Sequence, residues 1–232
     1  MSPAPDQPPA VVVFDLGGVL ATPVELVPHL ARLARVPVGP FETAYWAHRA
    51  AYDAGGLDAA YWDAVVAAGG GTPTDALTRT LTAADCEGWG DLPRVSRLLL
   101  AELAAAGTRL GLLSNAPVAM ARWVRGADWA HPFEHLVVSG EQGCLKPDPV
   151  VYGLTAGLFA VDPARVLFFD DRTENVDGAR RAGWDARLWA GPADCRAVLA
   201  ERGVLPAVAT ASQPGRGLES PPMSATGPGG RG

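Results

Sequence analysis

Short apolar runs without polar alternation recur along this chain, and each predicts a strand that is buried on both faces. Such runs are typical of parallel sheets, because helices cover both sides of the sheet. The clear examples are residues 11–14, 110–113, 136–138 and 166–169, with residues 186–189 as a weaker candidate. We therefore expect a mainly parallel sheet built from these segments.

Segments with helical spacing separate the apolar runs. One stripe has four apolar residues followed by a glycine suited to end a helix, namely Val95, Leu98, Leu99, Leu103 and Gly107. Residues 151–158 and 176–182 show similar stripes. Strands that alternate with helices predict an α/β fold with a doubly wound, Rossmann-like parallel sheet. Ligands of such sheets bind at the carboxyl ends of the strands.

One long stretch breaks this alternation. Between about Pro23 and Trp89 the pattern shows only short helical segments and no convincing strand. We interpret residues 23–90 as an all-helical cap domain inserted into an α/β core formed by residues 11–22 and 91–205. The two ends, residues 1–10 and 206–232, are rich in small residues and proline, and we predict that both are disordered.

Charge and composition exclude several classes of function. The 232-residue chain has a net charge of −6 and no basic cluster, which argues against nucleic acid as its main ligand. No apolar run approaches the roughly 18 residues of a membrane helix, and the N-terminus has no signal pattern. We therefore expect a soluble, cytoplasmic protein with no membrane partner. The widely spaced Cys86, Cys144 and Cys195 predict buried thiols, with neither a disulfide framework nor a zinc motif.

Polar residues follow the predicted strands at their carboxyl ends. Asp15 ends the first strand, Ser114-Asn115 the second and Asp170-Asp171 the fourth, and Lys146 lies just beyond the third. In a parallel sheet all of these meet at one edge. Carboxylate oxygens suit a hard cation such as Mg²⁺, and an ammonium group with a hydroxyl suits phosphoryl oxygens.

The same residues carry a resemblance to a known family. The sequence resembles the haloacid dehalogenase-like (HAD) hydrolase superfamily, in the subfamilies with a helical cap after the first strand. The motifs that carry it appear in the family's order: residues 14–19 (FDLGGV), residues 113–115 (LSN), Lys146-Pro147, and residues 169–172 (FDDR) followed by Asn175 and residues 178–179. Together they span about residues 11–189.

This resemblance implies a role for each residue at the strand ends. Asp15 would be the nucleophile that forms an aspartyl-phosphate, with Ser114 and Lys146 as the other catalytic residues. Mg²⁺ would be held by Asp15, the Gly17 carbonyl, Asp170 and Asp171. Ser114, the Asn115 backbone and Lys146 would bind the phosphoryl group. The implied activity is that of a magnesium-dependent phosphatase acting on a small phosphorylated metabolite.

One position departs from the family pattern. Most phosphatases of the family carry a second Asp two residues after the nucleophile, as an acid toward the leaving oxygen, and this chain has Gly17 there. General acid catalysis contributes roughly 10²–10⁴-fold in rate. Two alternatives remain open: the natural substrates have good leaving groups, or His48 or Asp53 supplies the proton from the cap.

The region around these two residues is dense in aromatic and ionisable side chains. On a helix, four of them share one face: Tyr45, His48, Arg49 and Tyr52. We expect this face to line the substrate pocket, with His48 and Arg49 binding substrate. The alternative is that the tyrosines form the cap core and that Arg49 and Asp53 form an exposed ion pair.

Three functions remain open from the sequence. A phosphatase is favoured by the intact nucleophile, lysine and metal pair. A dehalogenase or phosphonatase-type hydrolase would use the same Asp15, and the resemblance implies that a dehalogenase would need no metal. A catalytically weak phosphate-binding module would explain the missing acid. Fold alone does not choose among them.

Overall fold

The computed structural model describes residues 7–206, so most of the two predicted disordered ends lies outside the described residues. Its centre is a sheet of five parallel strands in the order β3-β2-β1-β4-β5. The strands are β1 (Val11–Phe14), β2 (Leu110–Ser114), β3 (Phe133–Val138), β4 (Val166–Asp170) and β5 (Asp185–Leu188). The α/β, Rossmann-like prediction is confirmed, and the strand bounds differ from the expected ones by three residues at most.

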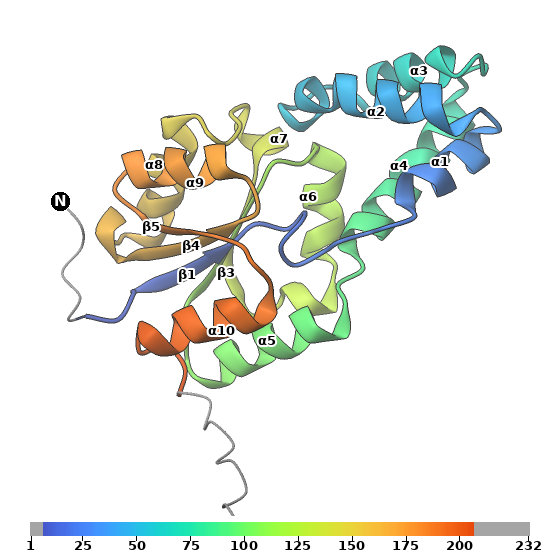
Figure 1. Cartoon of the computed structure of the whole chain (residues 1–232). Coiled ribbons are helices and arrows are strands. Elements are labelled where there is room, and N and C mark those ends of the chain that lie inside the picture. The colour runs from blue at the N-terminus through green and yellow to red at the C-terminus, as the bar shows by residue number, and fades with distance from the viewer. Residues whose placement is uncertain (1–6, 207–232) are drawn as a thin grey trace, which may run out of the picture.

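Helices cover both faces of the sheet (Figure 1). Alternate residues of β1 face opposite sides, as the twofold repeat of a strand requires. Val12 and Phe14 pack with α5 (Arg94–Ala105), α6 (Val118–Arg125) and α10 (Pro192–Glu201), whereas Val11 and Val13 pack with α8 (Pro149–Phe159) and α9 (Thr173–Arg181). Three shorter elements complete this part of the chain: α7 (Ser139–Gln142) and the 3₁₀ turns η1 (Asp128–Ala130) and η2 (Pro163–Arg165).

The buried stripe of α5 differs from the predicted one. Leu99 and Leu103 are buried as expected, but the side chains of Val95 and Leu98 are 47% and 51% exposed. Ser96 and Leu100 are buried in their place. The run of three leucines at 98–100 offers two neighbouring stripes with the same spacing. Packing against the sheet determines which of the two stripes is buried. Helical periodicity alone does not distinguish them.

Residues 23–90 hold four helices and no strand. They are α1 (Leu26–Ala34), α2 (Val38–Asp53), α3 (Asp58–Ala68) and α4 (Asp75–Gly90), and we call them the cap. The cap has its own hydrophobic cluster, in which the rings of Phe41, Tyr45 and Trp62 are fully buried. In Figure 1 the cap extends to one side of the sheet, beyond α6 and α7.

Two side-chain hydrogen bonds link the cap to the core, in addition to the packing of α4 against α6. At the base of the cap, the Trp129 Nε1 donates to the carbonyl of Gly90 at 2.9 Å. At the other end, the Ser139 hydroxyl of α7 donates to the carbonyl of Asp53, the last residue of α2, at 2.6 Å. Within residues 7–206, no helix has both the length and the apolar character needed to cross a membrane.

Candidate active site

The predicted strand-end residues meet at one edge of the sheet. Asp15 follows β1 directly, Ser114 is the last residue of β2, and Asp170 is the last residue of β4. A cavity of about 620 Å³ opens over this edge, and Asp15, Ser114, Lys146 and Asp171 are among the residues that line it. Asp170 lies beneath the cavity and is fully buried.

Lys146 links the carboxylates at the base of the cavity. Its Nζ lies 3.0 Å from Asp15 Oδ1 and 2.6 Å from Asp170 Oδ2, and it donates to the carbonyl of Leu113 at 2.8 Å. Burial lowers the pKa of Lys146, but the charges of Asp15 and Asp170 outweigh that effect and raise the pKa above its ordinary value. Lys146 is therefore a buried, permanently charged ammonium at neutral pH.

Amide side chains fix the positions of these charged groups. Asn115 accepts from the backbone N–H of Lys146 at 2.8 Å and donates to its carbonyl at 2.9 Å. The Asn175 side chain donates to both oxygens of Asp170, at 2.9 and 3.2 Å. The Asn115 side chain thus positions Lys146, and only the backbone of Asn115 remains to bind a ligand. The role of Asn175 was not assigned from the sequence, although the residue belongs to the fourth motif.

Three carboxylates at this edge of the sheet lie close enough together to share a cation. One oxygen each of Asp15, Asp170 and Asp171 lies within 4.8 Å of the others. Asp171 also lies against Gly18, where φ is +75° and a Cβ atom would come within 2.2 Å of its Oδ2. An all-oxygen set of this kind fits a hard cation such as Mg²⁺.

The electrostatics of these carboxylates favour a cation. Burial raises the pKa of Asp15 to about 7, even though Lys146 opposes this shift, and the neighbouring Asp170 adds to it. Burial, with Asp170 as the next cause, also raises the pKa of Asp171. A bound cation would offset the repulsion between these groups and keep them ionised.

The cap contributes the opposite wall of the cavity. Arg49 and Asp53 line it from α2, together with Trp46, and Trp89 lines it from α4. His48, which was expected to bind substrate with Arg49, is exposed and is not among the residues that line the cavity. Successive residues of a helix point about 100° apart, so the face that carries Arg49 turns His48 toward solvent.

Arg49 lies in a buried polar cluster, so the alternative of an exposed ion pair with Asp53 is wrong. Its Nε donates to Asp53 at 2.8 Å, and its Nη1 lies 3.1 Å from Asp85 Oδ2. Tyr45, which is buried as the cap-core alternative expects, donates to Asp85 at 2.6 Å and also accepts from Arg49. Asp85 was missed from the sequence, where its spacing of four residues from the apolar Leu81, which places both on one helix face, is the available signal.

Replacing Arg49 with Met is expected to destabilise the cap strongly. Asp85 and Asp53 would lose their shared counter-charge while 2% and 10% of their side chains are exposed. Removing one partner of a buried ion pair typically costs about 3–5 kcal/mol. Urea unfolding followed by fluorescence would measure the loss, with Arg32→Met on the exposed face of α1 as the matched control. Equal stability of the two variants would contradict a structural role for the cluster.

An aromatic ring packs closely against Gly17, the position of the missing acid. A Cβ atom built on Gly17 would lie 3.1 Å from the six-membered ring of Trp89. The indole does not move freely, because its Nε1 donates to the Tyr45 hydroxyl at 2.9 Å. A side chain at position 17 would therefore require the indole of Trp89 to shift by a few tenths of an ångström.

Gly17→Asp alone is therefore expected to lower hydrolysis of an aryl phosphate and not to restore an acid, because the new Cβ atom forces the hydrogen-bonded indole to shift. When Trp89 is already replaced with Ala, adding Gly17→Asp is expected to cause a smaller loss of rate than it causes in the wild type. Initial rates of the two single variants and the double variant measure this coupling. Full activity of Gly17→Asp with Trp89 intact would contradict the packing argument.

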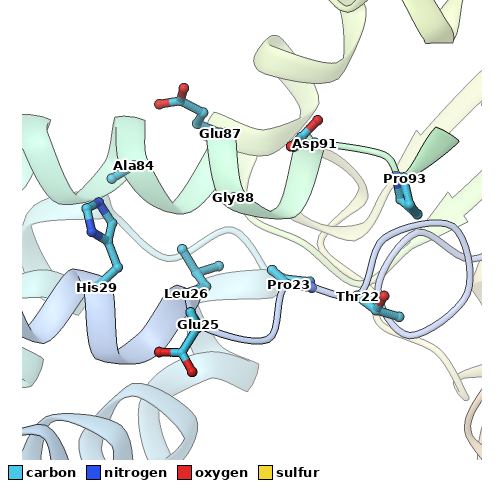
Figure 2. A pocket seen from close by; sticks show the side chains of 10 residues that line it. All are labelled: Thr22, Pro23, Glu25, Leu26, His29, Ala84, Glu87, Gly88, Asp91 and Pro93. Carbon is cyan, nitrogen blue, oxygen red and sulfur yellow. The ribbon is translucent and has the colours of Figure 1, made fainter.

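A second cavity, of about 540 Å³, lies where the cap joins the core (Figure 2). Thr22 and Pro23 line it from one connecting segment, Pro93 lines it from the other, and His29 and Glu87 line it from α1 and α4. None of the predicted catalytic, metal or substrate residues contributes to it. This cavity marks the junction of cap and core, and the expected chemistry belongs to the cavity above Asp15.

Comparisons of sequence agree with this geometry. Residues 9–183 match the family model for haloacid dehalogenase-like hydrolases. A phosphoserine phosphatase of Thermus thermophilus is 35% identical over 109 residues, which cover 46% of this chain and 39% of that protein. A phosphatase of Mycobacterium tuberculosis is 33% identical over 121 residues, covering 51% of this chain and 54% of that protein. The matches thus span about half or less of the length of these curated relatives.

Solved structures show the same fold. A HAD family enzyme from Bacteroides thetaiotaomicron, in complex with magnesium and inorganic phosphate, has a TM-score of 0.61 at 21% identity and covers 76% of this chain and 92% of its own. The L-2-haloacid dehalogenase of Xanthobacter autotrophicus has a TM-score of 0.62 at 21% identity, covering 85% of this chain and 84% of its own. At these identities the likeness extends to the fold alone.

Proposed function

The chain belongs to the haloacid dehalogenase-like hydrolase family, and we propose from this premise that it is a magnesium-dependent phosphatase. Its substrate is a small phosphorylated metabolite, and the reaction passes through an aspartyl-phosphate on Asp15. The names of the two curated relatives, a phosphoserine phosphatase and a phosphatase, support this choice within the family. The cap, which closes the cavity over Asp15, would select the leaving group.

The observation that carries the proposal is the combination of charges around Asp15. Lys146 contacts Asp15 and Asp170, and the three carboxylates of Asp15, Asp170 and Asp171 have oxygens within 4.8 Å of one another. A phosphate ester brings negatively charged oxygens that need both an ammonium and a metal ion. Hydrolysis of a haloacid would not require the group of three carboxylates.

Each residue at the strand ends has a definite task in this reaction. Leu16 N–H donates to Asp15 Oδ1 at 2.7 Å, and Lys146 lies 3.0 Å from the same oxygen, so the carboxylate is held in one orientation. Asp15 attacks phosphorus as the bond to the leaving oxygen breaks, and water then attacks phosphorus and frees Asp15. Lys146 and the Ser114 hydroxyl hold phosphoryl oxygens through both steps.

The proposed metal ligands are Asp15, Asp170, Asp171 and the Gly17 carbonyl. Three backbone hydrogen bonds close the loop after β1. Gly18 N–H donates to the Ala21 carbonyl at 2.8 Å, and the N–H groups of Leu20 and Ala21 donate to the Leu16 carbonyl at 2.9 and 2.8 Å. None of these bonds uses the Gly17 carbonyl, which leaves it for a cation. Bound Mg²⁺ would supply positive charge to the phosphoryl oxygens.

Release of inorganic phosphate tests the proposed function. With Mg²⁺, the protein is expected to release phosphate from nitrophenyl phosphate and from at least one member of a panel of sugar, nucleotide, acyl and amino-acid phosphates. Release of halide from a 2-haloacid in the presence of chelator would instead identify a dehalogenase. Binding of inorganic phosphate and Mg²⁺ without any turnover would identify a phosphate-binding module.

A further inference from the structure

A leaving alkoxide needs a proton when its bond to phosphorus breaks, because it is a far stronger base than water at neutral pH. Three residues that line the cavity carry carboxyl groups, namely Asp15, Asp53 and Asp171. Asp15 and Asp171 belong to the proposed nucleophile and metal set. Asp53 lines the cavity from the cap, and it is the one carboxyl group of these three without a role as nucleophile or metal ligand.

The position of Asp53 relative to the reacting edge is fixed by a hydrogen-bonded bridge. The Ser139 hydroxyl donates to the Asp53 carbonyl at 2.6 Å and accepts from the backbone N–H of Ala116 at 3.0 Å. Ala116 directly follows Ser114 and Asn115, whose loop is proposed to hold the phosphoryl group. One buried hydroxyl therefore ties the end of α2 to this loop and fixes the backbone of Asp53 relative to it.

The contacts of the Asp53 side chain leave one oxygen for a reactant. Oδ1 accepts from Arg49 Nε at 2.8 Å. Among residues 7–206, no donor lies within hydrogen-bond distance of Oδ2. This oxygen is also not one of the fully buried polar atoms without a partner, so part of its surface is accessible. Because 10% of the side chain is exposed and Asp53 lines the cavity, Oδ2 has access to that space.

The surroundings of Asp53 also allow it to carry a proton. Arg49 is shared between two carboxyl groups, and Asp85 takes both Arg49 Nη1 and the Tyr45 hydroxyl. Burial raises the pKa of Asp53 to about 7, with Arg49 opposing the shift and Asp85 adding to it. The other ionisable groups that share its surroundings are Tyr61 in the cap and, across the cavity, Asp15, Lys146, Asp171 and Arg172.

We propose that Asp53 is the proton donor to the leaving oxygen, a role that rests on the proposed phosphatase function. As Asp15 bonds to phosphorus, the electron pair of the breaking bond goes to the leaving oxygen, which takes the proton from Asp53 Oδ2. The products are an alcohol, the aspartyl-phosphate and an ionised Asp53 beside Arg49. In the second step Asp53 takes a proton from the attacking water, so phosphate leaves and both carboxyl groups return to their starting states.

Asp53→Asn tests this role, because the amide keeps an acceptor for Arg49 but transfers no proton. Across a series of phosphate esters with rising leaving-group pKa, the variant is expected to lose about 10²–10⁴-fold in kcat/KM at the alkyl end. Nitrophenyl phosphate, whose leaving group is stable as an anion, is expected to be hydrolysed nearly as fast as by the wild type. Glu42→Gln, on the exposed face of the same helix, is the matched control.

The pH profile gives an independent readout. The protonated form of Asp53 is the active one, so wild-type kcat/KM for an alkyl phosphate falls as pH rises through its pKa of about 7. This alkaline limb is expected to disappear in Asp53→Asn. Ser139→Ala, which weakens the bridge but keeps the carboxyl group, is expected to retain the limb and lose part of the rate on alkyl esters.

Two results would overturn the assignment. An equal loss on all esters with the limb retained would mean that Asp53 only positions Arg49. Absence of the alkaline limb in the wild type would exclude Asp53 as donor even if Asp53→Asn did not fold. Failure of the proposed function itself is distinguishable, because the wild type would then release no phosphate from nitrophenyl phosphate.

Discussion

Replacing Asp15 with Asn is expected to lower kcat on nitrophenyl phosphate by at least about 10⁴-fold, the scale on which loss of a nucleophile acts. The amide has the shape of the carboxylate but forms no acyl phosphate. Asp15 directly follows β1 at the centre of the sheet, 3.0 Å from Lys146, so its backbone is held by the strand and not by the carboxylate charge. Initial rates over a range of substrate concentrations measure the effect.

The control for this substitution separates chemistry from folding. Asp15→Asn removes a buried charge, so circular dichroism and the thermal unfolding midpoint are expected to stay close to the wild-type values. Asp63→Asn, on the exposed surface of α3, is the matched charge change outside the cavity and should leave activity unaltered. If Asp15→Asn kept more than a few per cent of the wild-type rate, Asp15 would not be the nucleophile.

Removal of the metal is the second change with a large expected effect. In excess EDTA, phosphate release should fall to the background rate, and added Mg²⁺ should restore it. Without the cation, Asp15, Asp170 and Asp171 repel one another, and burial and Asp170 oppose ionisation of Asp15, whose pKa lies near 7. The nucleophile would then be partly protonated at neutral pH. Arg49, the other buried cation that lines the cavity, is already paired with Asp53 and Asp85, so Lys146 would be the main charge left to balance the phosphoryl group.

Variants of Asp170 test whether the metal requirement arises from the proposed metal site. Asp170→Asn removes a charge from the metal site and keeps only one acceptor oxygen, so either Lys146 Nζ, which donates to Oδ2, or the backbone N–H of Arg172, which donates to Oδ1 at 2.9 Å, loses its acceptor. Titration of activity with Mg²⁺ should show a sharply increased requirement in this variant and in Asp170→Ala. Full activity in chelator would contradict the metal-dependent mechanism and would favour a metal-free hydrolase on the same nucleophile.

Much of the core and its edge could be predicted from the sequence, because strands buried on both faces are encoded as continuous apolar runs. Asp15, Ser114 and Asp170 follow or end three such runs, and a parallel sheet brings them together whatever the connecting helices do. The choice of the buried stripe in α5 could not be predicted in the same way. Leu98 and Leu99 are chemically equivalent, and only the contact with the sheet distinguishes them.

The cap was less predictable than the core, for a physical reason. The aromatic and ionisable residues of α2 are interspersed around the helix, so the sequence does not mark one face clearly as the buried one. The buried position of Arg49 depends on Asp85, which lies 36 residues away along the chain. The packing of Trp89 over Gly17 likewise joins the cap to the loop after β1, and no local pattern records such a long-range contact.

The stereochemical course at phosphorus tests the central claim, transfer of the phosphoryl group to Asp15 and then to water, most directly. Each in-line displacement inverts the configuration at phosphorus, so two successive displacements restore it. Hydrolysis by the wild-type protein of an ester made chiral at phosphorus with oxygen isotopes is predicted to give inorganic phosphate with retained configuration. Inversion would show a single direct attack by water and would contradict an aspartyl-phosphate intermediate.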